Sequence, residues 1–366
     1  MAEKVVWGAG REAEFVSWID AELQEAQTAR QSLDRQWREW LAQYRAPAKQ
    51  ALKKFPFEGA SNYIVPITAT DADQLYAKFL QTIHAPQNLW TLAPLNERWV
   101  EAAKPLQDYL QWLDFAILRM YNTNKRALLE MVKLGTAIYK TGWTFEQRPV
   151  WTYNDLGQRV RMTRLRSLPF VDHVRLADFV LPAYSYAIQP DAQGGAPWVA
   201  ERLRIKTDTL RSMASAQEPF LPNISKETVE FLAHFEEPNV PEHDAEIQEL
   251  DFVKRPRVAK ESFDQSSEPT GTKGVGGAFQ LPKEIELWEV HARFPTTAKD
   301  SQDDVIVWYH QPTRKIVRAV YNYFHHDKRP YDVVRYFPGD GFYGIGICEH
   351  KEMFKTLGSE LLNFTV

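Results

Sequence analysis

Two prolines and a glycine restrict what the first third of this chain can fold into more than any other feature. Pro56 and Pro66 disfavour helix for the residues just before them, and Gly59 permits a positive φ angle. We therefore expect residues 55–65 to be extended or turned. The simplest interpretation is a buried hinge between two helical layers.

The segment after Pro66 carries the pattern of an amphipathic helix. Thr68 and Asp71 have the spacing of a capping box, which predicts that the helix begins there. The apolar residues behind them recur at steps of three and four and form one stripe: Ala69, Ala72, Tyr76, Phe79 and Ile83. Pro86 should end this helix.

Helices are also predicted on both sides of this segment. Residues 11–46 should form one long helix or a helical pair, with an apolar cluster in each half. Residues 97–123 and 125–140 should form two further helices. The apolar stripe of the first is Val100, Leu106, Leu110, Leu113, Ile117 and Met120, and the stripe of the second ends at Ile138. Pro105 is expected either to kink the first of these or to mark its true first turn.

A β hairpin is predicted next in the chain. Residues 143–146 and 151–153 lead to a turn signal at 154–157, and residues 158–168 should return as the partner strand. The returning strand is rich in arginine: Arg161, Arg164 and Arg166. These side chains could face phosphate, but a solvated strand face is the simpler interpretation.

The second half of the chain alternates between ordered and irregular patterns. Residues 171–180 and 198–204 resemble β segments, and a short helix should begin at Thr207. Residues 214–283 hold one probable helix at 226–235 and otherwise look like a surface insertion with a flexible linker.

Order should return after the insertion. The pattern predicts three consecutive antiparallel strands, at 285–294, 305–310 and 315–321. Another extended piece should follow at 333–337, then a glycine-rich bend at 339–346 and a last helix at 347–366. The last helix runs to Val366 without a stop signal, which suggests that the pattern continues beyond it.

Composition narrows the class of protein. The 366 residues are 44% hydrophobic and 25% charged, which is typical of a globular chain, and the formal net charge of -4 argues against a general nucleic-acid binder. The single cysteine, Cys348, excludes an internal disulfide and favours a reducing compartment. Neither a signal peptide nor a membrane-spanning apolar run is recognised.

Signals for catalysis are weak throughout. His325, His326 and Asp327 could form the corner of a metal site, but adjacent side chains on an extended backbone point to opposite faces. The glycine-rich segment 271–277 lacks the order of a phosphate-binding loop. We assign no catalytic, cofactor-binding or metal-binding residue, and we expect that this chain is not an enzyme.

Several short motifs follow one another in a recognisable order. They are Trp37, Trp40 and Tyr44; PFEGAS at 56–61; VPI at 65–67; Asp71 and Leu75; VRLADFVLP at 174–182; WVAERL at 198–203; KRPY at 328–331; and FYGIGI at 342–347. Together they resemble the portal proteins of tailed double-stranded DNA bacteriophages, and the resemblance covers about residues 15–210 and 284–366.

This resemblance implies a structural subunit of a ring, usually of twelve copies, at one vertex of the capsid. Double-stranded DNA would be pumped in by the terminase large subunit and leave through the same channel, without sequence-specific binding. The ring would contact the major capsid protein and dock a head-to-tail adaptor. It would assemble in the host cytoplasm and end in the virion.

The implied fold is α+β, a wing of long helices packed on antiparallel strands that ends in the start of a stem helix. Residues 1–213 would be the N-terminal wing, 214–283 a variable insertion, 284–345 the β part of the wing and 346–366 the first part of the stem. The rest of the stem, the clip and the crown would lie beyond. Two alternatives stay open: a metal-dependent nuclease that uses the His325/Asp327 region, and a free-standing protein-binding module.

Overall fold

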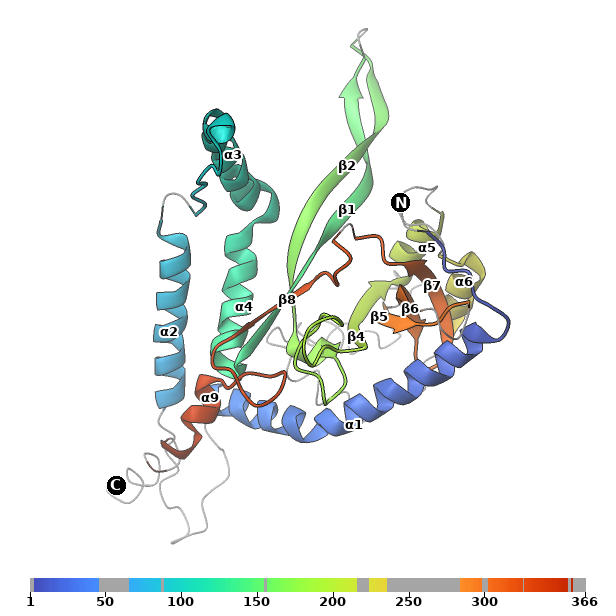
Figure 1. The fold of residues 1–366 in the computed structure, drawn as a ribbon. Coiled ribbons are helices and arrows are strands. Elements are labelled where there is room, and N and C mark those ends of the chain that lie inside the picture. The colour runs from blue at the N-terminus through green and yellow to red at the C-terminus, as the bar shows by residue number, and fades with distance from the viewer. Residues whose placement is uncertain are drawn as a thin grey trace, which may run out of the picture.

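The computed structural model describes residues 3–45, 66–86, 89–154, 157–215, 224–235, 284–297, 302–324, 326–354 and 357, with 145–149 and 165 described as backbone only. The fold is α+β, as predicted, with helices packed on two antiparallel sheets (Figure 1). The predicted hinge at 55–65, most of the 214–283 insertion, His325 and most of the last helix lie outside these residues.

The N-terminal segment forms one helix, α1 (Arg11–Arg45), which runs along one edge of the molecule (Figure 1). Its two apolar clusters enter two different cores, because the helix is long enough to underlie both. Phe15, Ile19 and Leu23 pack against one sheet. Trp37 and Trp40 pack in the core that also holds Ala72, Leu128 and Ile347.

The larger sheet has the strand order β3-β4-β5-β6-β7 and is antiparallel throughout. Its strands are β3 (Phe179–Val180), β4 (Trp198–Lys206), β5 (Glu284–Phe294), β6 (Asp303–His310) and β7 (Lys315–Tyr321). The three consecutive strands predicted after residue 284 are confirmed. Strand β4, from before the predicted insertion, pairs with β5 from after it. Helices α5 (Thr207–Ser215) and α6 (Lys226–His234) pack on this sheet with a small core of their own.

The smaller sheet has the order β2-β1-β8. The predicted hairpin is confirmed but is longer than expected, with β1 (Thr136–Tyr153) paired to β2 (Arg159–Val174). Strand β8 (Tyr331–Arg335) joins only the root of β1, between Thr136 and Lys140. The segment predicted as β over 171–180 is interrupted by a 3-10 turn, η3 (Leu176–Asp178).

The predicted capping box at Thr68 is wrong. Helix α2 (Ile67–His84) begins after Pro66 and has no side-chain cap. Thr68 is buried inside its first turn, where its hydroxyl accepts a hydrogen bond of 2.9 Å from Gln43 of α1. The Asp71 carboxylate pairs instead with Lys351, at 3.0 Å. The prediction that the helix stops before Pro86 is confirmed.

The helix boundaries between residues 97 and 140 also differ from the prediction. Pro105 lies well inside α3 (Val100–Trp112). The helical segment is broken at Arg119, whose φ of 51° separates η2 (Leu113–Leu118), which follows α3, from α4 (Met120–Leu134). Helix α4 ends at Gly135, whose φ of 90° is left-handed. Residues 136–140, predicted as helix, are the first residues of β1.

Helices α1, α2, α4 and the short α9 (Ile347–His350) meet around a buried lysine. Lys133 of α4 is 1% exposed, and its ammonium lies 3.4 Å from the centroid of the Tyr44 ring. The Tyr44 hydroxyl donates a 2.7 Å hydrogen bond to Asp73 of α2. Burial lowers the pKa of Lys133 to about 8.

This lysine gives a testable pH dependence. Because its folded pKa lies below the ordinary value of 10.5, the unfolded chain binds more protons above about pH 8. We expect the free energy of unfolding to rise by about 1–2 kcal/mol between pH 7.5 and 9.5. Denaturant titrations at the two pH values measure this. The Lys133→Met variant should lose the rise, and an equal rise in that variant would contradict the assignment.

Candidate assembly surface

The hairpin formed by residues 141–169 projects far from the rest of the molecule (Figure 1). The Thr141 amide still donates a 2.8 Å hydrogen bond to the Pro330 carbonyl, but past it strand β1 pairs only with β2, so neither outer edge of this two-stranded ribbon is paired there in the sheets described. An isolated two-stranded hairpin is marginally stable in water. The sequence nevertheless places large apolar side chains along it.

Both faces of the hairpin expose apolar side chains. Side chains alternate between the faces of a strand, so the register of β1 and β2 assigns them. One face carries Trp143, Trp151, Tyr153, Arg159 and Arg161, and the other carries Val150, Val160, Met162, Arg164 and Arg166. Trp151 is 57% exposed and Tyr153 is 73% exposed. The guanidinium of Arg159 lies 4.7 Å from the centroid of the Trp151 ring.

A second exposed apolar element is the arm, which we define as η1 (Glu97–Trp99), α3 and η2 (Leu113–Leu118). Helix α3 has no buried residue, although amphipathic helices in globular proteins owe most of their stability to a buried face. Trp99, Leu106 and Tyr109 recur at steps of seven and three, so they share one side of the arm. All three are exposed.

The apolar stripe predicted over residues 97–123 runs through the arm. Val100 and Leu106 of that stripe are exposed, while Leu110 and Leu113 are only half-buried. The aromatic residues that dominate the exposed surface, Trp99, Tyr109 and Trp112, fall outside it. Trp99 lies on η1, and Tyr109 and Trp112 lie on α3. Their gathering on the arm was the available signal, because large aromatic side chains serve interfaces as well as cores.

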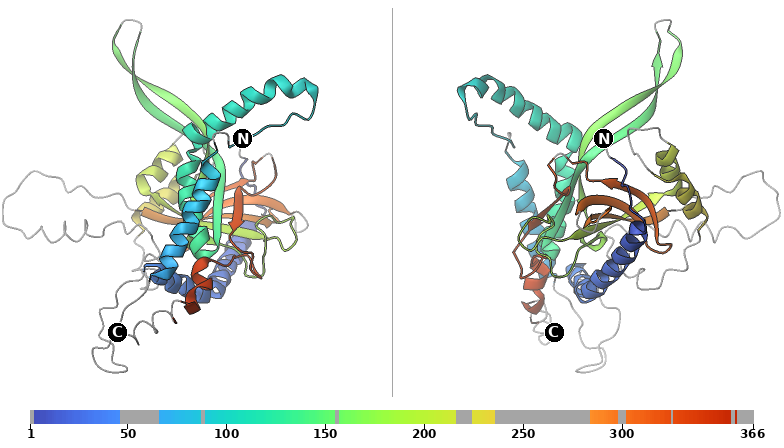
Figure 2. Two further views of the ribbon diagram at one scale, coloured as in Figure 1. Left: turned by 90° about the vertical axis from the view of Figure 1, so that its left-hand side faces the viewer. Right: turned by 45° about the vertical axis from the view of Figure 1, so that its right-hand side comes forward.

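The arm and the hairpin leave the same end of the molecule in diverging directions, as both views of Figure 2 show. Their charges also differ. Residues 141–169 hold five arginines and two acidic residues, and residues 97–118 hold four acidic and two basic residues. Contiguous exposed apolar surface is found at protein–protein and membrane interaction sites and in ligand-binding grooves.

A cluster of buried charges anchors the root of the hairpin. The Lys140 ammonium of β1 lies 2.6 Å from a carboxylate oxygen of Glu201 on β4 and 2.8 Å from one of Glu289 on β5. The Tyr331 hydroxyl on β8 donates to Glu201 at 2.9 Å, and the Trp308 indole on β6 donates to Glu289 at 3.1 Å. The cluster therefore ties the smaller sheet to the larger one.

Burial sets the protonation of this cluster. Burial raises the pKa of Glu201, so this carboxyl is the easier of the two to protonate. Burial also opposes the charge on Glu289, but Lys140 and His291 outweigh it and hold the pKa of Glu289 well below its usual range. His291 lies 3.0 Å from Glu289, and burial lowers its own pKa, which favours the neutral imidazole.

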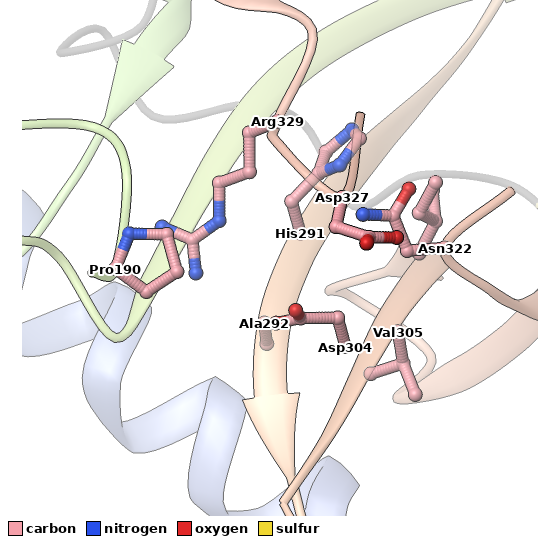
Figure 3. A pocket seen from close by; sticks show the side chains of 9 residues that line it. Pro190, His291, Ala292, Asp304, Val305, Asn322, Asp327 and Arg329 are labelled. Carbon is pink, nitrogen blue, oxygen red and sulfur yellow. The ribbon is translucent and has the colours of Figure 1, made fainter. Parts of the chain in front are cut away.

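A small hollow lies beside this cluster (Figure 3). It is lined by Pro190, His291, Ala292, Asp304, Val305, Ile306, Asn322, Asp327 and Arg329. The Arg329 guanidinium donates to the carbonyls of Ile188, Ala196 and Pro197, each at 2.7 Å. The hollow has room for about one water molecule, so it is too small for a substrate.

The residues considered for metal binding do not converge in the part of the chain that is described. Asp327 and His326 are exposed in a turn, where His326 Nδ1 accepts a 3.0 Å hydrogen bond from the Lys328 amide. Within the described ranges, no group of three or more His, Cys, Asp or Glu side chains could hold a metal ion. Cys348 is buried.

The arginines of β2 take the position expected for a solvated strand face, since Arg161, Arg164 and Arg166 are all exposed. No described helix is both long and apolar enough to cross a membrane.

Comparisons with protein-family models and with curated proteins found no match for this chain. The most distinctive feature of the described residues is the exposed apolar surface of the hairpin and the arm.

Proposed function

We propose that this chain is the wing of a bacteriophage portal subunit, a structural component of a ring at one capsid vertex. Such a ring, of about twelve copies, would pass double-stranded DNA during packaging and ejection. It would bind the terminase large subunit, a head-to-tail adaptor and the major capsid protein. The proposal includes assembly in the host cytoplasm, incorporation into the virion and no catalytic activity.

One observation supports this proposal above the others. The arm and the hairpin both expose large aromatic side chains, and α3 buries none of its residues within the subunit. A ring of identical subunits needs extensive interfaces, on the order of 2,000 Å² or more for obligate assemblies. The α+β fold and the portal-like motifs at 174–182, 198–203 and 342–347 add to the support. Within the described residues no group of side chains could hold the metal of a nuclease, whereas the exposed aromatic surface also suits a free-standing protein-binding module.

Electron microscopy of the purified full gene product in negative stain, together with its mass in solution, tests the proposal. We expect rings with a central hole and a mass close to twelve subunits. A DNA-cleavage assay with Mg²⁺ or Mn²⁺ should show no activity. Monomers that cut DNA would favour the nuclease, and compact monomers that do not would favour the binding module.

A further inference from the structure

We propose that the hairpin of one copy packs against the arm of the next copy around the ring. This inference rests on the proposed function, because it specifies which surfaces of the wing form the interface between subunits. It is not required by that function, since a ring could close through other surfaces. The partner that covers the exposed surface of the hairpin is thus a second copy of this chain.

Ring geometry requires two different surfaces on each subunit. In a cyclic ring every interface joins one surface of a subunit to another surface of its neighbour. Within one chain η2 contacts strand β2, but α3 and the outer part of the hairpin diverge, so α3 does not cover the hairpin (Figure 2). In a ring, by contrast, the hairpin of each subunit can extend toward the arm of its neighbour.

The two elements are complementary in charge and in chemistry. Residues 141–169 carry a net charge of +3, and residues 97–118 carry a net charge of -2. Trp151 and Tyr153 on the hairpin and Trp99 and Tyr109 on the arm are all exposed. Aromatic side chains and arginine are enriched in protein interfaces, and complementary charges steer the two surfaces together and fix their register.

A basic ribbon with exposed aromatic rings could instead bind nucleic acid. Two observations favour a protein partner. Both faces of the hairpin expose apolar side chains, including Val150 and Met162, which contribute nothing to binding phosphate. An acidic aromatic surface of matching character is present on the same chain, at the arm. The charge-exchange variants described below distinguish DNA binding from assembly.

Cross-linking between engineered cysteines tests which elements meet. Thr163 lies on the hairpin face of Trp151 and Arg161, and Ala102 lies between Trp99 and Leu106 on the same side of the arm. Both are exposed, and the native Cys348 is buried. The Thr163→Cys/Ala102→Cys double variant, treated with a short bismaleimide and run on a denaturing gel, should give a ladder of dimers, trimers and higher species.

The single variants identify the symmetry of the contact. An equal mixture of Thr163→Cys and Ala102→Cys chains, assembled together, should give dimers only. Each single variant alone, like the parent chain, should give none. Dimers from Thr163→Cys alone would show that hairpins meet each other and would overturn the inference.

The outcomes separate the inference from the function on which it rests. Rings by microscopy without a hairpin-to-arm ladder would overturn the inference and leave the portal proposal standing. Absence of rings at any protein concentration would overturn the portal proposal itself. A ladder obtained from rings supports both.

A charge exchange gives a second, independent readout. Arg159→Glu/Arg161→Glu on the hairpin, or Glu101→Lys/Asp108→Lys on the arm, should each raise the concentration for half-assembly at least tenfold. Combining all four changes should restore assembly to within about threefold of the parent. Glu12→Lys on α1, also exposed, is the control and should change nothing. The inference fails if the hairpin variant assembles normally but loses binding to a DNA duplex at 0.15 M NaCl.

Discussion

Replacing Lys140 by methionine is expected to lower the free energy of unfolding by about 3–5 kcal/mol. Methionine keeps the length of the side chain but removes the charge that holds Glu201 and Glu289 together in the interior. Two buried carboxyls would then face each other without a cation, and one of them would have to take up a proton. Urea or guanidinium titration of the variant at neutral pH measures the loss.

Two control variants test whether the buried charge is responsible. Lys351→Met removes a half-exposed ion pair with Asp71 and should cost less than about 1 kcal/mol. Adding Glu201→Gln and Glu289→Gln to Lys140→Met should recover part of the stability, because no charge is then left unpaired. If Lys140→Met costs no more than Lys351→Met, the cluster does not hold the two sheets together.

Replacing Gly135 by alanine should cost about 2–5 kcal/mol, as the sum of a left-handed backbone and overpacking. The φ of Gly135 is 90°, and a Cβ there would lie 2.1 Å from the carbonyl oxygen of Gly344. The neighbouring atoms are backbone on both sides, so they cannot move away as a flexible side chain would. Thermal and denaturant unfolding of the purified variant measure the effect.

Gly10 provides the matched control. Its φ is 78°, but a Cβ at this position would meet nothing within 4 Å. Gly10→Ala should therefore show the backbone cost alone, about 1–2 kcal/mol. Equal losses at the two glycines would mean that the close approach of the C-terminal loop to α4 contributes nothing.

Local sequence patterns predicted the elements of this fold better than their limits. Apolar periodicity identified α1 and the three strands after residue 284, because each carries a regular pattern over many residues. The helix predicted to residue 140 was too long because Ile138 fits a helical stripe as well as a strand. Gly135 was the available signal, since glycine often ends a helix in the left-handed conformation.

Long-range partners could not be predicted from local patterns. Strand β8 was expected as an extended piece, but its pairing with the root of β1 joins residues almost 200 positions apart. The same holds for Lys140, Glu201 and Glu289, each of which lies in a mainly apolar strand. A charge within such a strand indicates a buried partner, yet only the fold shows that these three share one.

Candidate sites were predictable to a different degree. The hairpin and its arginines were expected, and their exposure is confirmed for Arg161, Arg164 and Arg166. The apolar stripe predicted over residues 97–123 did not indicate that α3 has no buried residue, because apolar spacing is the same whether or not a helix packs within its own chain. Apolar periodicity shows that a helix has an apolar face, but it does not show what covers that face.

The position of Lys140 has a mechanical consequence. It stands where the hairpin leaves the body, and its partners lie on strands of the other sheet. Any force that a neighbouring molecule exerts on the distant tip acts as on a lever whose fulcrum is this residue. Displacement of the tip would therefore strain the five-stranded sheet directly. In the proposed ring, this strain could transmit the tilt of one subunit to the next.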